Sequence, residues 1–181
     1  MKSVFDRIFR RQRQQDGDLD ETHDVTVSMP EDEDVWNTGF PLVPDDYHLQ
    51  HVGKTLQGNG YWIDIQLAVE KDGTRDFVAA YIFDKEGCLI SSEVVDQGMR
   101  TGAPVQTTEE IIGKLKKKIA AKDTSEILVK PFSTSFYGHT FGLVAREADE
   151  SKDATAETLI DAMPGHTLMF YGPWSLCNYD T

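Results

Sequence analysis

The stretch GYWIDIQLAVEKDGTRDFVAAYIFD, residues 60–84, decides how this chain of 181 residues folds. Two runs rich in β-branched and aromatic residues, 60–70 and 75–84, flank the turn signal KDGT. β-Branched and aromatic side chains suit the pleated surface of a sheet, and an Asp-Gly pair between two such runs is typical of a hairpin. The sequence therefore predicts an antiparallel β-hairpin near the middle of the chain.

The two strands of this hairpin differ in their faces. In the first strand an apolar set alternates with a partly polar one: Tyr61, Ile63, Ile65, Leu67 and Val69 against Trp62, Asp64, Gln66 and Ala68. This alternation predicts one apolar face and a second face that is open to water. The second strand is apolar on both faces, so we expect it to be a central strand that is covered on its two sides.

Similar runs occur on both sides of the hairpin. Residues 47–56 and 88–96 are separated from it by the turn signals QGNG and KEG, and four later runs have the same character: 126–132, 138–146, 157–163 and 166–172. Short strands with turn signals between them are typical of an antiparallel meander. Eight strands seldom stay flat, so we expect the sheet to be curled or split.

One good helix signal lies between the two groups of strands. In TTEEIIGKLKKKIA, Thr107 and Glu110 have the spacing of a capping box, and lysines fill the last turn. The predicted fold is therefore α+β: a largely antiparallel, curled or split sheet of about eight strands, one internal helix over about 107–121, and a short N-terminal helix.

The chain divides into three predicted parts. Residues 1–15 form an amphipathic arm in which Phe5, Ile8 and Phe9 have helical spacing among arginines. Two interpretations of this arm stay open, a docking element for a membrane surface or partner and a loosely held terminus. Residues 16–45 read as an acidic, proline-containing linker, and residues 46–181 as a single α+β domain.

The charge balance limits the class of partner. Lysine and arginine number 18 against 31 aspartates and glutamates, which gives a net charge of −13 at pH 7. This acidic excess disfavours binding to nucleic acid or anionic lipid, which requires cationic groups that displace counterions from phosphates, so we expect no nucleic-acid partner. A basic protein partner fits better, because opposite charge speeds its encounter.

The cysteine content and the distribution of apolar residues favour a cytoplasmic location for the protein. Only two cysteines are present, Cys88 and Cys177, and they form no CxxC pair, which fits a reducing compartment. No uninterrupted run of about 18 apolar residues exists, so no integral membrane segment is predicted, and the N-terminus lacks the apolar core of a secretory signal.

No motif assigns a cofactor, a metal or a catalytic residue. His48 and His51 are three residues apart, a spacing that places them on opposite faces of a strand, and no glycine-rich stretch has a nucleotide-binding context. One catalytic alternative stays open, a Cys–His–Asp arrangement of Cys177 and Asp180 with His139 or His166. Nothing in the spacing requires it.

Binding residues are predicted near strand ends, where aromatic side chains gather. The candidates are Tyr137, His139, Trp174, Tyr179 and Asp180. Aromatic residues in such places line clefts or protein-binding patches when they are not core. For the C-terminal stretch YGPWSLCNYDT we expect a clasp, with Trp174 packed on the sheet and Tyr179 anchoring the end of the chain.

The C-terminal third also resembles a known family. The segments ILVKPFSTSFYGHTFGLV, MPGHTLMFYGPW and the final YDT resemble small bacterial proteins labelled formate hydrogenlyase regulatory protein, HycA-like. The resemblance is best over residues 127–181. It is carried by Lys130, Phe132, Thr134, Gly138, Phe141, Gly142, Leu143, Pro164, Gly165, Pro173, Trp174, Tyr179, Asp180 and Thr181. SLCN stands where the pattern has an acidic residue and a glycine. The resemblance implies a compact bacterial domain and no particular reaction, cofactor or substrate.

These observations favour a non-enzymatic, acidic bacterial binding or regulatory protein that acts through a protein partner. Two versions stay open, a regulator of a metabolic complex and an antidote or immunity protein that blocks a basic toxin. The alternatives are a small hydrolase or transferase with a cleft near the C-terminus and a small-ligand-binding domain.

Overall fold

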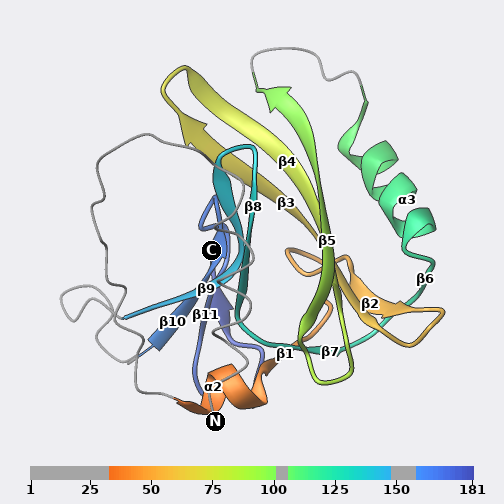
Figure 1. Ribbon diagram of the computed structural model, residues 1–181, viewed down its shortest axis with the longest axis vertical. Helices are drawn as coiled ribbons and strands as arrows, with labels where there is room; N and C mark the ends of the chain where they lie inside the picture. Colours follow the sequence, from red (N-terminus) through yellow and green to blue (C-terminus); the bar gives the residue numbers. More distant parts are fainter. Residues whose placement is uncertain (1–32, 101–105, 148–157) are drawn as a thin grey trace, which may run out of the picture.

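The computed structural model describes residues 33–100, 106–147 and 158–181, which are arranged in three layers (Figure 1). Helix α3 lies on the outer face of one five-stranded sheet, and the other face of that sheet packs on a second five-stranded sheet. A two-stranded ribbon and the short helix α2 lie at one end of the two sheets. The candidate sites described below lie at the ends and the outer face of this sandwich.

The elements follow one another with few long connections. The helices are α2 Glu33–Thr38 and α3 Thr108–Lys118. The strands are β1 Phe40–Leu42, β2 Val52–Thr55, β3 Gly60–Glu70, β4 Gly73–Phe83, β5 Leu89–Met99, β6 Ala121–Thr124, β7 Ile127–Val129, β8 Phe132–Phe136, β9 His139–Glu147, β10 Thr158–Met163, β11 Met169–Tyr171 and β12 Tyr179–Asp180.

The predicted α+β class with about eight strands is wrong. Of the described residues 54% are in strands and 11% in helices, and the strands form three antiparallel sheets, so the fold is mostly β. Four strands have no counterpart among the predicted runs and span two to five residues each: β1, β6, β8 and β12. Strands this short carry too little alternation to be recognised, and each is stabilised by backbone hydrogen bonds to a neighbouring edge. The predicted internal helix is present as α3, and the predicted N-terminal helix lies outside the described residues.

The predicted hairpin forms the centre of the first sheet, whose strand order is β5-β4-β3-β2-β6. Strands β3 and β4 pair along their whole length, from Gly60 opposite Phe83 to Glu70 opposite Gly73. The second sheet has the order β12-β11-β10-β9-β8, again with antiparallel neighbours. Each of its strands after β8 therefore lies beside the strand that precedes it in the chain.

The water-facing side predicted for β3 is instead its buried side. Trp62 and Gln66 are 1% exposed because the second sheet packs over them, whereas Ile65 is 49% and Val69 82% exposed. Alternation shows that a strand has two different faces, but the layer that packs on it decides which face loses contact with water.

Helix α3 covers the other face of the first sheet. Its apolar residues Ile111, Ile112 and Leu115 pack on Tyr61 and Val78. The predicted capping box is present, because Thr107 accepts a hydrogen bond from the Glu110 backbone while the Glu110 carboxylate accepts one from Thr107. Local sequence therefore specifies where this helix begins.

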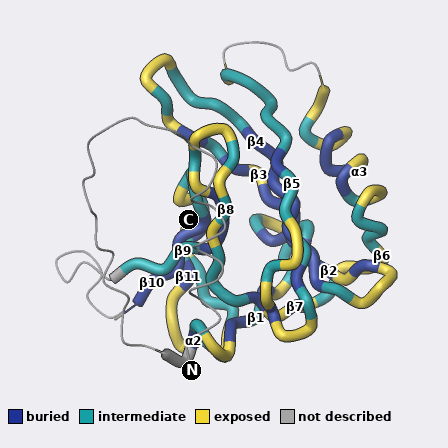
Figure 2. The backbone as a smooth tube through the Cα atoms, viewed as in Figure 1, coloured by how far each residue is buried: buried dark blue, intermediate teal, exposed yellow. Residues whose placement is uncertain are grey.

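Residues 33–42, which fall in the predicted linker, also contribute to the core. The side chains of Val35, Phe40 and Leu42 are at most 1% exposed, and β1 pairs with β7. Figure 2 shows the buried positions gathered between the two sheets and beneath α3, with exposed positions at the turns.

Candidate functional site

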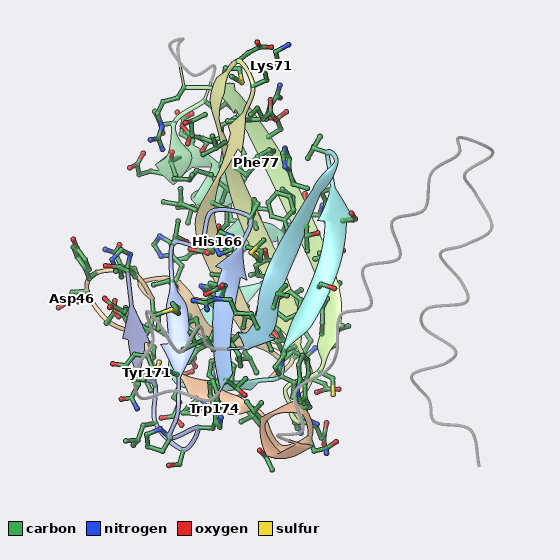
Figure 3. The ribbon with its side chains drawn as sticks, turned by 90° about the vertical axis from the view of Figure 1, so that its left-hand side faces the viewer. Asp46, Lys71, Phe77, His166, Tyr171 and Trp174 are labelled. Carbon is green, nitrogen blue, oxygen red and sulfur yellow. The ribbon has the colours of Figure 1, made fainter. Side chains whose placement is uncertain are left out.

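The predicted binding residues lie in separate parts of the molecule. Tyr137 lies in the β8–β9 turn, where it stacks on Phe77, and His139 is the first residue of β9, whereas Trp174 lies near the opposite end of the sandwich (Figure 3). Tyr179 and Asp180 are the two residues of β12, at the edge of the second sheet. The structure therefore does not assemble the five residues into one site.

The β8–β9 turn joins the two sheets. The rings of Tyr137 and Phe77 have centroids 5.8 Å apart, and His139 Nε2 lies 3.0 Å from Glu70 Oε1. Arg75 Nε lies 3.1 Å from the same Glu70 oxygen. Because Glu70 and Arg75 belong to β3 and β4, this network ties the β8–β9 turn to the central hairpin. Its groups are already engaged with each other, which indicates a structural role.

The segment after β1 is attached to β12 by one carboxylate. Asp45 Oδ1 accepts hydrogen bonds from the backbone N–H groups of Tyr47, His48 and Leu49, at 2.7, 2.8 and 2.9 Å. Asp45 Oδ2 accepts a further hydrogen bond from the Tyr179 hydroxyl. Leu49 is fully buried, so the far end of this turn is held in the core.

This bond shifts the pKa values of both partners. Partial burial and then the neighbouring Asp45 carboxylate raise the pKa of Tyr179 to about 12. Partial burial acts to raise the pKa of Asp45, but the hydrogen bonds from Tyr179 and the backbone outweigh it and lower that pKa. At neutral pH a protonated hydroxyl therefore donates to an ionised carboxylate, which is the stronger kind of hydrogen bond.

Apolar and acidic side chains surround this attachment point. Tyr47 is 76%, Leu176 54% and Val43 41% exposed. The thiol of Cys177, the residue after Leu176, accepts a hydrogen bond from the Val43 backbone at 3.4 Å, which ties the C-terminal segment to the segment after β1. We call this region the clasp surface and define it by Val43, Asp45, Asp46, Tyr47, Glu126 and Leu176.

The expected clasp at the C-terminus is formed by packing beneath this surface. The Trp174 ring contacts Phe40 at 5.6 Å, and the Tyr179 ring contacts Phe170 at 5.9 Å. Both rings lie against buried residues, so Trp174 and the ring of Tyr179 belong to the support of the clasp surface rather than to its exposed part.

The catalytic arrangement around Cys177 is not supported. In the described part of the chain, Cys177 bonds to the Val43 backbone, His139 pairs with Glu70 and His166 pairs with Asp161. Burial raises the pKa of the Cys177 thiol, which disfavours the thiolate that a nucleophile requires. Cys88, by contrast, is exposed.

This difference predicts the order in which the two thiols react. With an aromatic disulfide reagent at pH 7.5, we expect Cys88 to react several-fold faster than Cys177. Burial of Cys177 lowers the fraction of its thiolate form and restricts the access of the reagent. Cys88→Ser and Cys177→Ser variants assign the two phases. A fast phase that disappears in Cys177→Ser would restore the nucleophile hypothesis.

A second cluster of polar side chains lies on the outer face of the second sheet, around a cavity of about 250 Å³. Strand register places Asp161 of β10 opposite Met169 of β11, and Met169 opposite Asp180 of β12. The Asp161 side chain is 5% exposed, and its Oδ2 accepts a hydrogen bond from Arg146 Nε at 2.8 Å. His166 Nδ1 lies 3.2 Å from the same oxygen.

The β10–β11 turn that carries His166 is held from inside the sandwich. Gln66 Oε1 accepts from the Gly165 backbone and Gln66 Nε2 donates to Thr167 Oγ1, both at 3.1 Å. His166 itself has φ +49° and points outward beside Asp161 (Figure 3). The neighbours on either side of His166 are therefore fixed to β3.

Gln66 is also bonded to a buried acid. Its Nε2 donates to Asp64, whose second oxygen accepts from the Ile65 backbone at 2.9 Å. Burial raises the pKa of Asp64 to about 7. Sequence reasoning assigned no role to Asp64, Gln66, Arg146 and Asp161. The available signal was the presence of polar residues within otherwise apolar strand patterns.

A broader groove of about 720 Å³ lies between residues 44–51, which include part of the clasp surface, and α3. Asp45, Asp46 and Gln50 line one side, and Lys116 lines the other. Lys116 Nζ lies 3.2 Å from His51 Nδ1, and burial followed by this lysine lowers the pKa of His51. The groove extends the clasp surface toward the helix.

The described residues offer neither a metal-binding cluster nor a membrane-spanning helix. No group of three or more His, Cys, Asp or Glu residues is placed there to hold a metal ion, and no helix there is long and apolar enough to cross a membrane. No protein-family model, no curated protein and no solved structure matches the chain.

Proposed function

We propose that this protein is a non-enzymatic binding protein that docks a basic protein partner through the clasp surface. The observation that carries the proposal is the placement of Tyr47, 76% exposed, on a segment whose backbone is held by Asp45. Asp46 is exposed beside it, and Val43 and Leu176 provide apolar area. An exposed aromatic anchor among carboxylates suits a partner surface that combines lysine or arginine with apolar side chains.

The rigidity of the segment supports this proposal. Three backbone N–H groups and the Tyr179 hydroxyl converge on Asp45, so the loop is ordered before a partner arrives. A preorganised loop loses less conformational entropy on binding, and tyrosine is enriched among the residues that dominate interface energies.

The charge of the whole chain acts in the same direction. A net charge of −13 attracts a basic protein over a distance of about one Debye length, which is roughly 8 Å at physiological salt. Two versions of the function follow from it. The resemblance to formate hydrogenlyase regulatory proteins favours a regulator, and the strong acidity favours an antidote that covers a basic toxin.

A paired-variant capture experiment tests the proposal. The full chain is immobilised and exposed to native lysate of the source organism at low salt, and retained proteins are eluted with salt. A Tyr47→Ala, Asp46→Lys variant alters the clasp surface. A Val69→Ala, Asp72→Lys variant makes the same kind of change at the exposed β3–β4 turn.

We expect the wild type and the β3–β4 control to retain one basic protein, which salt releases. The clasp variant should retain at least about tenfold less of this protein, as for removal of an interface anchor. Equal retention by both variants, or retention of no basic protein, would contradict the proposal. Circular dichroism of each variant shows whether it is folded.

A further inference from the structure

We infer that the cavity on the outer face of the second sheet binds the cationic end of an amphipathic ligand, a guanidinium or an ammonium group. The inference goes beyond the proposed docking function. Tyr179 and Asp180 are consecutive in β12 and so point to opposite faces of the sheet, one toward the clasp and the other toward this cavity. Either proposal can therefore fail without the other.

The first argument is the orientation of the His166 imidazole. A carboxylate only accepts hydrogen bonds, so the contact with Asp161 at 3.2 Å places the proton of a neutral imidazole on Nδ1. Nε2 is then an acceptor. The His166 side chain is 59% exposed at the cavity, so this acceptor is available to a hydrogen-bond donor on a ligand.

The second argument is the charge of the lining. Asp161 and Asp180 contribute two carboxylates, and Arg146 contributes one guanidinium whose Nε is already bonded to Asp161. Among the groups that carry a fixed charge, the two carboxylates therefore exceed the single guanidinium. Asp180 lies at the exposed rim, where its carboxylate can meet a cation without first being desolvated.

The third argument is the shape and the apolar part of the lining. Met169 lies between Asp161 and Asp180 in the register of the sheet, so a flexible thioether separates the two carboxylates. Arginine and lysine side chains combine an apolar stem with a charged end, and a cavity of about 250 Å³ has room for one such chain. A small anion has less to gain here, since two carboxylates repel it.

The site is also preformed. The backbone of the turn on both sides of His166 is bonded to Gln66 in β3, and Asp161 is fixed by Arg146. The acceptors therefore hold their positions before a ligand arrives, which lowers the entropic cost of binding. Gln66 acts as a positioning residue, because it reaches the cavity only through the turn.

The test is a titration of the full-length protein followed by the NMR signals of its histidine side chains. The probes are agmatine, an acetylated and amidated Gly-Arg-Gly peptide, and the same peptide with citrulline, which keeps the shape of arginine without its charge. His139 is the internal control, because it also pairs with a carboxylate but lies at the β8–β9 turn. An Asp180→Asn variant removes the rim charge.

We expect a saturable shift of the His166 signals with agmatine or the arginine peptide, no shift of His139, and no saturable effect of the citrulline peptide. Asp180→Asn should weaken binding about tenfold, as for loss of one charged hydrogen bond. Preference for agmatine would identify a small amine as the ligand, and preference for the peptide a protein side chain. Absence of a His166 shift with both cations, an equal response to citrulline, or unchanged affinity in Asp180→Asn would overturn the inference.

Discussion

The free energy of unfolding of the wild-type protein is expected to fall as the pH rises from about 4 to about 7. Replacing Asp64 with asparagine should abolish most of this loss. Asp64 is buried between the two sheets, and burial raises its pKa from 3.8 to about 7. Its hydrogen bonds from Gln66 and the Ile65 backbone oppose this shift without cancelling it. Between about pH 4 and pH 7, Asp64 therefore keeps its proton in the folded protein and loses it in the unfolded chain.

The direction of the effect follows from proton linkage. Below about pH 4 the carboxyl is protonated in both states and costs nothing. Between the two pKa values the folded state binds more protons than the unfolded state, so the free energy of unfolding falls as the pH rises. Above about pH 7 the loss in the free energy of unfolding is constant. It is on the order of 4 kcal/mol, because the pKa is raised from 3.8 to about 7 and each pKa unit corresponds to 1.36 kcal/mol.

Urea denaturation of wild type and Asp64→Asn at pH 4.5, 6 and 8 measures the effect. The difference in the free energy of unfolding, variant minus wild type, should increase by several kcal/mol across this range. Asp72→Asn at the exposed β3–β4 turn is the matched control and should leave the difference flat. Parallel pH profiles for wild type and Asp64→Asn would show that folding does not raise the pKa of Asp64.

Replacing Gly142 with alanine is expected to cost more than about 4 kcal/mol, enough to unfold many domains of this size. Gly142 has φ +132°, and a Cβ at this position would lie 2.3 Å from the Phe132 backbone oxygen. It pairs with Ser133 on one side and Met163 on the other, so the backbone of three strands would have to move together to relieve the collision.

Gly138→Ala separates the collision from the backbone strain. Gly138 also has a positive φ, +77°, but apart from its chain neighbours no atom of the described residues lies within 4 Å of a Cβ built there. Its replacement should cost only about 1–2 kcal/mol, the usual penalty for a left-handed residue with a side chain. Urea denaturation followed by circular dichroism compares the two variants. Similar losses for both would show that the second sheet can shift to accept a side chain.

The contacts within the candidate sites join residues that are distant in the chain, and these contacts could not be predicted from the sequence. The sequence predicts Tyr179 as an anchor, because aromatic residues near a chain end need a place to pack, but its partner Asp45 is 134 residues away in the chain. The bond from Arg146 to Asp161 depends on the pairing of β9 with β10, which places both side chains on one face. Contacts of this kind arise from register, which no local pattern specifies.

The sequence by itself determined the elements whose signals are local. Alternation and an Asp-Gly turn specified β3 and β4, and a capping box specified the start of α3, because these signals act within a few residues. The tertiary structure decided which face of β3 is buried, where the short strands pair, and that Asp64 lies away from water. A strand presents two faces to its surroundings, and the packing of the second sheet on one face and of α3 on part of the other determines which side chains lose contact with solvent.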